Sequence, residues 1–136
     1  MMQKLPERRG LRSDDTRTAI TYQLAYSAVQ AGMDGLVLAD GAGVLVGASP
    51  STHRPEEIAA FSPLALNPDA RVGGEIGKRS DVTIQCFDFE GARLLLIGLG
   101  GMSSHRAGAM VRSMHGVVRI LRTSPTRPAL RASKPN

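Results

Sequence analysis

Residues 34–49, DGLVLADGAGVLVGAS, give the clearest indication of the fold. They contain two short apolar runs, at 35–39 and 44–46, separated by Asp-Gly-Ala-Gly at 40–43. Because such residues accept the positive φ angles of tight turns, the stretch predicts a β-hairpin. The first run contains no polar residue. We therefore expect both faces of its strand to be covered, as in the middle of a sheet with helices packed on it.

A helix is predicted before this hairpin. Ser13 or Asp14 can accept hydrogen bonds from the free N–H groups of a first turn, and Gly32 supplies a C-terminal stop. We expect one apolar stripe of this helix to lie on the sheet and another to lie on a neighbouring helix or a second subunit. The first stripe is Ile20, Leu24, Ala28 and Ala31, and the second is Tyr22, Tyr26 and Val29.

A short helix is predicted after the hairpin. Ser51 or Thr52 can cap it, and Pro55 suits its first turn. Because Pro63 has no backbone N–H, we expect the helix to kink there or to end near Ser62.

A second hairpin is predicted from the runs VTIQCFDFE at 82–90 and RLLLIGL at 93–99. The apolar residues of the first run change face after Cys86. This predicts either a β-bulge near Cys86 or a strand that is apolar on both faces. The run at 93–99 is apolar on both faces and should be covered on both.

The remaining segments are a loop and a last helix. Residues 67–80 have low periodicity and predict a loop, with a further short strand at 70–77 as the alternative. Ser103 or Ser104 can cap the last helix, which extends to about Arg122. Its apolar stripe is Ala107, Val111, Met114, Val118 and Leu121.

The predicted order is α-β-β-α-β-β-α, an α+β fold in which helices pack on an antiparallel sheet of two hairpins. We expect a single domain over residues 14–122, with a disordered tail at 1–13 and a basic disordered tail at 123–136. No apolar run approaches the length of a membrane span, and the N-terminus is too charged for a signal peptide. A cytoplasmic protein is therefore expected.

The net charge of +5 belongs to the two ends of the chain. Residues 1–17 hold five basic and three acidic side chains, and residues 122–136 hold four basic ones, which leaves 18–121 at −1. The basic residues are sparse and are not interleaved with aromatic ones. Solvated tails are therefore favoured over a nucleic-acid or membrane-binding arm.

No catalytic or cofactor-binding motif is found in the sequence. The turn at 98–104, GLGGMSS, follows a strand and opens a helix, but it lacks the lysine of a P-loop and favours a purely geometric role over anion binding. His53, His105 and His115 lack metal-ligand spacing, so we expect no metal, and His53 and His105 should face solvent. Cys86, the single cysteine, is expected in the core. We predict no enzyme activity and no cofactor.

The sequence has more large apolar residues than one small sheet needs to cover it. A partner protein could cover these residues, although the alternative is that they complete the core of a monomer. The candidate protein-interface residues are Ile58, Phe61, Leu64, Phe87 and Phe89.

The segment 34–49 resembles the first hairpin of the roadblock/dynein light-chain family, and the order of elements over about 14–122 is similar to that of this family and its GAF- and profilin-like relatives. The resemblance implies a non-enzymatic, homodimeric domain that scaffolds or regulates small Ras-like GTPases, including in bacterial signalling systems. It carries no functional residues over, because the family has no catalytic motif.

Three functions follow from this reading. The leading one is a homodimeric scaffold or regulator that binds a signalling protein such as a small Ras-like GTPase. The second is a GAF-like sensory module that holds a small ligand between the sheet and residues 67–80. The third, which the charge distribution disfavours, is a nucleic-acid adaptor with basic tails.

Overall fold

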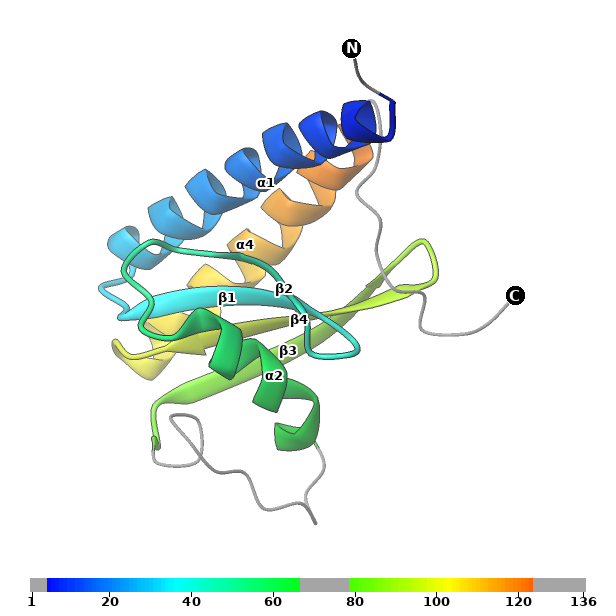
Figure 1. The fold of residues 1–136 in the computed structure, drawn as a ribbon. Helices are drawn as coiled ribbons and strands as arrows, with labels where there is room; N and C mark the ends of the chain where they lie inside the picture. Colours follow the sequence, from blue (N-terminus) through cyan, green and yellow to red (C-terminus); the bar gives the residue numbers. More distant parts are fainter. Residues whose placement is uncertain (1–4, 67–78, 124–136) are drawn as a thin grey trace.

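The computed structural model describes residues 5–66 and 79–123, with side chains from residue 15 onward. Its elements follow the predicted order α-β-β-α-β-β-α (Figure 1). They are α1 (Leu5–Gln30), β1 (Gly35–Asp40), β2 (Leu45–Ala48), α2 (Pro55–Ala65), β3 (Val82–Phe89), β4 (Ala92–Leu99) and α4 (Ser103–Thr123).

The four strands form one antiparallel sheet in the order β2-β1-β4-β3. Helices α1 and α4 lie side by side on one face, and α2 covers the other (Figure 1). All six residues of β1 are buried, as are the residues of β4 from Leu94 to Leu99. The prediction that these two strands lie inside the sheet is therefore confirmed.

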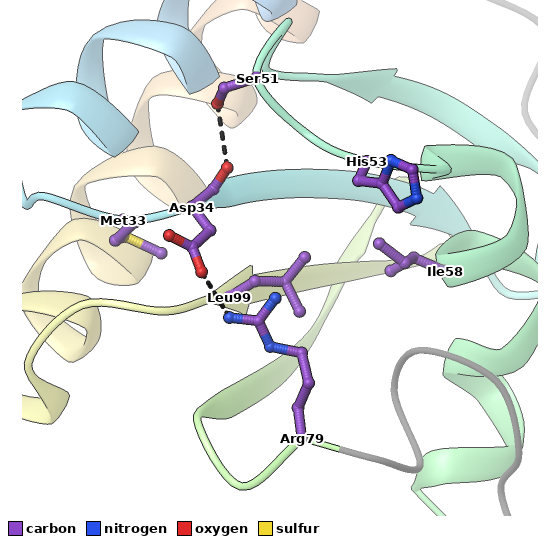
Figure 2. A pocket seen from close by; sticks show the side chains of 7 residues that line it. All are labelled: Met33, Asp34, Ser51, His53, Ile58, Arg79 and Leu99. Atoms are coloured by element: carbon purple, nitrogen blue, oxygen red, sulfur yellow. Dashed lines mark hydrogen bonds and ion pairs between the residues drawn. The ribbon is translucent and has the colours of Figure 1, made fainter.

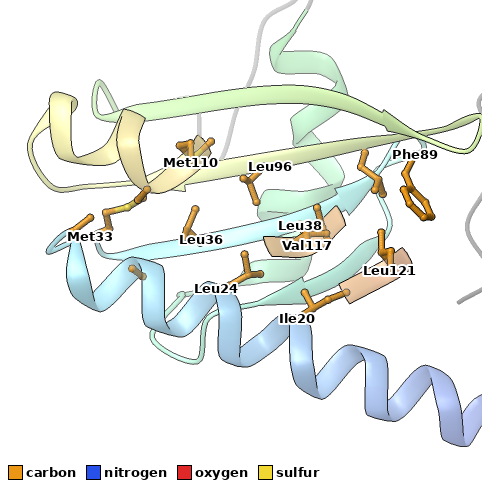
Figure 3. Packing of buried hydrophobic residues seen from close by; sticks show 14 residues of the cluster. Ile20, Leu24, Met33, Leu36, Leu38, Phe89, Leu96, Met110, Val117 and Leu121 are labelled. Atoms are coloured by element: carbon orange, nitrogen blue, oxygen red, sulfur yellow. The ribbon is translucent and has the colours of Figure 1, made fainter. Parts of the chain in front are cut away.

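Two apolar clusters fill the space between the layers because successive strand residues point to opposite faces. Leu36 and Leu38 join the first apolar stripe of α1 and residues of α4 on one face (Figure 3). Val37 and Ala39 pack with Ile58 of α2 on the other. This alternation determines which strand residues point to the α1 and α4 face and which point to the α2 face.

Helix α1 begins earlier than expected, at Leu5 instead of Ser13 or Asp14. A proline is tolerated in a first turn, so Pro6 does not prevent this start. The first apolar stripe is buried, as predicted. The second stripe is exposed: Tyr22, Tyr26 and Val29 retain 71%, 65% and 77% of their accessible surface. It therefore does not pack on α4.

Helix α2 departs from the prediction at its start, and it does not end near Ser62. Its N-cap residue is Arg54, in a left-handed conformation and without a side-chain cap. The Ser51 hydroxyl instead donates to the Asp34 carbonyl, 3.0 Å away. The helix also continues through Pro63 to Ala65. Ser62 Oγ donates to the Ala59 carbonyl at 2.8 Å, and this compensates for the N–H that proline lacks.

In the second half, the structure decides between the two alternatives for β3 and corrects the predicted stripe of α4. Strand β3 pairs with β4 without interruption, so there is no bulge near Cys86, and the alternative of a strand apolar on both faces holds. In α4 the side that enters the core is Arg106, Ala109, Met110, Ser113, Gly116, Val117 and Leu121. Of the predicted stripe, Leu121 is buried, Met114 and Val118 on the flank of the helix pack partly against the core, and Ala107 and Val111 are exposed. The expected loop at 67–78 and the alternative strand at 70–77 lie outside the described residues.

Candidate functional site

The five predicted interface residues do not form one surface. Ile58 and Phe89 are 2% and 6% exposed and belong to the protomer core, while Phe61 and Phe87 are half-buried. Leu64, at 48%, is exposed. Ile58 and Phe61 pack in the cluster on the α2 face, whereas Phe87 and Phe89 pack in the cluster on the opposite face. The interface role remains a prediction for the three that keep accessible surface.

The outer edge of β3 is a second candidate. β3 pairs only with β4 within the part of the chain that the structure describes. Helix α2 packs on β1, β2 and β4, and it leaves the side chains of β3 on that face partly uncovered. Val82 and Ile84 are half-buried, and Cys86 is exposed, which corrects its expected place in the core. We call the open backbone edge of β3 with these three side chains the β3 edge surface.

The β3 edge surface has the properties of a strand-pairing site. An edge strand presents unpaired N–H and C=O groups, which natural monomers protect with proline, charge, a bulge or a covering element. The strand VTIQCFDF contains no proline, and Asp88 is its single charged residue. Its eight-residue register with β4 is also regular. These features favour pairing with another strand.

A hollow of about 490 Å³, which we call the polar hollow, lies beside the N-terminal end of α2 (Figure 2). The start of β1, the residues before α2 and the residues before β3 contribute its walls. Its lining residues are Met33, Asp34, Ser51, His53, Ile58, Arg79 and Leu99.

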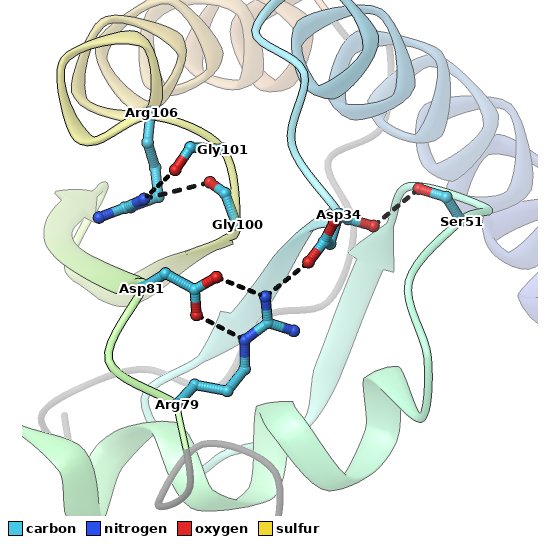
Figure 4. A network of polar contacts seen from close by, with 7 residues as sticks. All are labelled: Asp34, Ser51, Arg79, Asp81, Gly100, Gly101 and Arg106. Carbon is cyan, nitrogen blue, oxygen red and sulfur yellow. Dashed lines mark hydrogen bonds and ion pairs between the residues drawn. The ribbon is translucent and has the colours of Figure 1, made fainter.

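Arg79 organises the polar side of this hollow (Figure 4). Its Nη2 donates to Asp34 Oδ2 at 2.6 Å and to Asp81 Oδ2 at 2.8 Å, and its Nε donates to Asp81 Oδ1 at 2.7 Å. Hydrogen bonds to the two carboxylates raise the pKa of the guanidinium above its usual value. The hydrogen bonds that Arg79 donates to Asp81 lower the pKa of this carboxyl group to about 2. Because two carboxylates bind Nε and Nη2 and offset the charge of the guanidinium, its attraction for an anionic ligand is weakened.

The glycine-rich turn before α4 has a structural role. Gly100 and Gly101 have φ angles of 82° and 76°, and their carbonyls accept hydrogen bonds from Arg106 Nη1 at 3.1 and 3.0 Å (Figure 4). Arg106 Nε also donates to Thr83 Oγ1 at 2.8 Å. This buried arginine fastens the turn to β3. The prediction that this turn has a geometric role is therefore supported. Its two carbonyl oxygens face the positively charged guanidinium of Arg106.

Neither Arg79 nor Arg106 was identified from the sequence as a site residue. A signal for Arg106 does exist, because it precedes Met110, Ser113 and Val117 at steps of three and four on the buried side of α4. Arg79 has no such signal, since its partner Asp34 lies 45 residues away.

The described residues contain no group of three His, Cys, Asp or Glu side chains that could hold a metal ion. His53, His105 and His115 are exposed, as expected for the first two. Within those same parts of the chain, no helix has the length and apolar character needed to cross a bilayer.

Comparisons with known proteins bear on the fold. No protein-family model matches the chain, and no curated protein matches its sequence significantly. Among solved structures, MglB of Myxococcus xanthus, a roadblock-family protein, aligns with a TM-score of 0.56 and 10% sequence identity. The alignment covers 82% of this chain and 94% of that one. The resemblance seen in the hairpin sequence is thus matched in three dimensions: the chain has a roadblock-like α+β fold.

Proposed function

We propose that this protein is a non-enzymatic homodimeric scaffold or regulator that binds a signalling protein, and that this partner is a small Ras-like GTPase. The observation that supports self-association is the β3 edge surface, an open strand flanked by accessible apolar side chains. Two such edges, paired around a two-fold axis, would join the sheets of two protomers through backbone hydrogen bonds between their outer strands. The class of partner rests on the likeness to the roadblock family.

The structure offers a direct test of the dimer because Cys86 is the single cysteine and is exposed on β3. Two antiparallel β3 strands would bring the two copies of Cys86 close together. We expect a short bifunctional maleimide to cross-link the wild-type protein into dimers at micromolar concentration. Sedimentation should give the mass of a dimer under the same conditions.

A matched pair of variants controls for random collision. Thr18 is exposed on α1, at the opposite face of the sheet, so Cys86→Ser/Thr18→Cys should not cross-link although it also carries one thiol. A monomer at high concentration by sedimentation would contradict the dimer. Equal cross-linking of both proteins would contradict its geometry.

The GTPase is tested separately from the dimer. Purified small Ras-like GTPases from the source organism, loaded with GDP or with a non-hydrolysable GTP analogue, would be titrated against the protein. We expect binding that depends on the nucleotide, or a changed rate of nucleotide exchange or hydrolysis. A dimer that shows neither effect would support a scaffold for another protein and would contradict a GTPase as the partner.

A sensory module that binds a small ligand is the second candidate, and the polar hollow favours it. A ligand there would contact Arg79 and His53. Small molecules released from the purified, denatured protein would be identified by mass spectrometry. A stoichiometric ligand that is lost in Arg79→Ala would favour this function over the first.

A further inference from the structure

Helix α4 has an apolar flank that packs only partly against the core. Met114 and Val118 of the predicted stripe are half-buried, and Val111 is 43% exposed. Together with Phe87 of β3, Met114 and Val118 form the apolar part of a hollow of about 640 Å³ between β3 and α4. This hollow, which we call the α4 groove, faces away from α2 and from the polar hollow.

Basic residues follow the groove along one side of α4. Arg112, His115, Arg119 and Arg122 recur at steps of three and four, which places them on adjacent turns over about 15 Å. Helix α4 contains no Asp or Glu. The ion pairs of the described residues involve other arginines, so Arg112, Arg119 and Arg122 have no carboxylate partner within that part of the chain.

We propose that the α4 groove binds an acidic amphipathic helix of a partner protein. One or two apolar side chains of that helix would enter the hollow beside Phe87, Met114 and Val118. Its Asp and Glu residues would face Arg119 and Arg122 on the rim. This is the usual arrangement in which a helix lies in a groove, with apolar anchors for affinity and charge pairs for orientation.

The charges around the α4 groove favour an acidic helix over other possible occupants. Residues 124–136 of this chain carry three basic residues and no acidic one, so the C-terminal segment would be repelled by the rim, as would the same face of a second copy. Asp88 lines the β3 side of the groove and would oppose the phosphates of a lipid surface or a nucleic acid. A peptide can place a basic or neutral residue there. The inference does not depend on the proposed dimer or on a GTPase.

The test uses the full chain and an 18-residue helical peptide with leucines on one face and glutamates on the other. Binding would be followed through the ¹³C-methyl signals of the methionines, because Met114 lies in the groove and Met33 and Met110 lie in the core. We expect saturable shifts at Met114 and small ones at Met33. The same peptide with lysine in place of glutamate should bind at least ten-fold more weakly.

Two double variants that change the charge equally complete the test. Arg119→Glu/Arg122→Glu should weaken peptide binding at least ten-fold, whereas Arg17→Glu/Arg54→Glu, at exposed positions on α1 and before α2, should change it less than two-fold. Circular dichroism would verify that both variants are folded. No shift at Met114 up to millimolar peptide, or equal losses in the two variants, would overturn the proposal. Tighter binding to phosphatidylserine vesicles or duplex DNA than to the peptide, with the same dependence on Arg119 and Arg122, would also overturn it.

Discussion

Positive φ angles place very different demands on individual glycines. Gly100 has a φ of 82°, and a Cβ there would lie 2.6 Å from Asp34 Cγ and 3.0 Å from the Asp34 backbone nitrogen. Gly91, between β3 and β4, has a φ of 85° but no atom within 4 Å of such a Cβ. The first glycine is needed for its conformation and its packing, and the second for its conformation alone.

We therefore expect Gly100→Ala to lower the free energy of unfolding by about 3 kcal/mol, and Gly91→Ala by about 1 kcal/mol. Urea denaturation of the two variants measures the difference. Equal losses would mean that Asp34 moves aside without cost.

Two buried serines give an opposite pair of expectations. Ser113 Oγ has no hydrogen-bond partner among the described residues, whereas Ser62 Oγ donates to the Ala59 carbonyl beside Pro63. Ser113→Ala removes an unsatisfied group and should raise the free energy of unfolding by about 1 kcal/mol. Ser62→Ala leaves a carbonyl unsatisfied and should lower it by about as much. Thermal melts of both variants test this, and a loss in Ser113→Ala would indicate a partner for its hydroxyl.

At the scale of elements, the ion pairs of Arg79 hold the start of β3 against the start of β1. The pKa of Asp81 is lowered to about 2 from 3.8, so its contribution to stability is fully present above pH 4 and is lost as the pH falls toward 2. Both side chains are partly exposed, so the contribution is modest.

The expected result is a melting temperature that is higher in the wild type than in Asp81→Asn at pH 6, with a gap that narrows below pH 4. Comparing the two proteins removes the titration of the other carboxylates. A gap that stays constant down to pH 2 would contradict the lowered pKa of Asp81.

In the molecule as a whole, the two candidate surfaces use different side chains of β3. The β3 edge surface presents Val82, Ile84 and Cys86 on the α2 face, whereas the α4 groove uses Phe87 on the other face. Sites that share no side chains should respond independently to substitution.

Cys86→Lys should therefore weaken self-association at least ten-fold, because a lysine protects an edge strand, while the affinity for the acidic peptide changes less than two-fold. Arg119→Glu/Arg122→Glu should instead weaken peptide binding at least ten-fold and change self-association less than two-fold. Sedimentation and the methionine methyl titration measure the two quantities separately. If either variant impaired both, the two surfaces would be coupled through β3.

The order of the elements and the two inner strands follow from local patterns in the sequence. The turn at 40–43 and the unbroken apolar runs at 35–39 and 93–99 are local signals, and local signals are sufficient for strands that are covered on both faces. The first apolar stripe of α1 was predicted for the same reason.

The rotation of the helices and the pairing of charged groups depend instead on contacts between distant segments of the folded chain. One residue turns a helix by about 100°, so a small error in assigning the inward side of α4 exchanges the core for the flank that lines the groove. The burial of Ile58 and Phe89, the exposure of Cys86 and the pairing of Arg79 with Asp34 depend on contacts between distant segments. No periodicity within one segment carries that information.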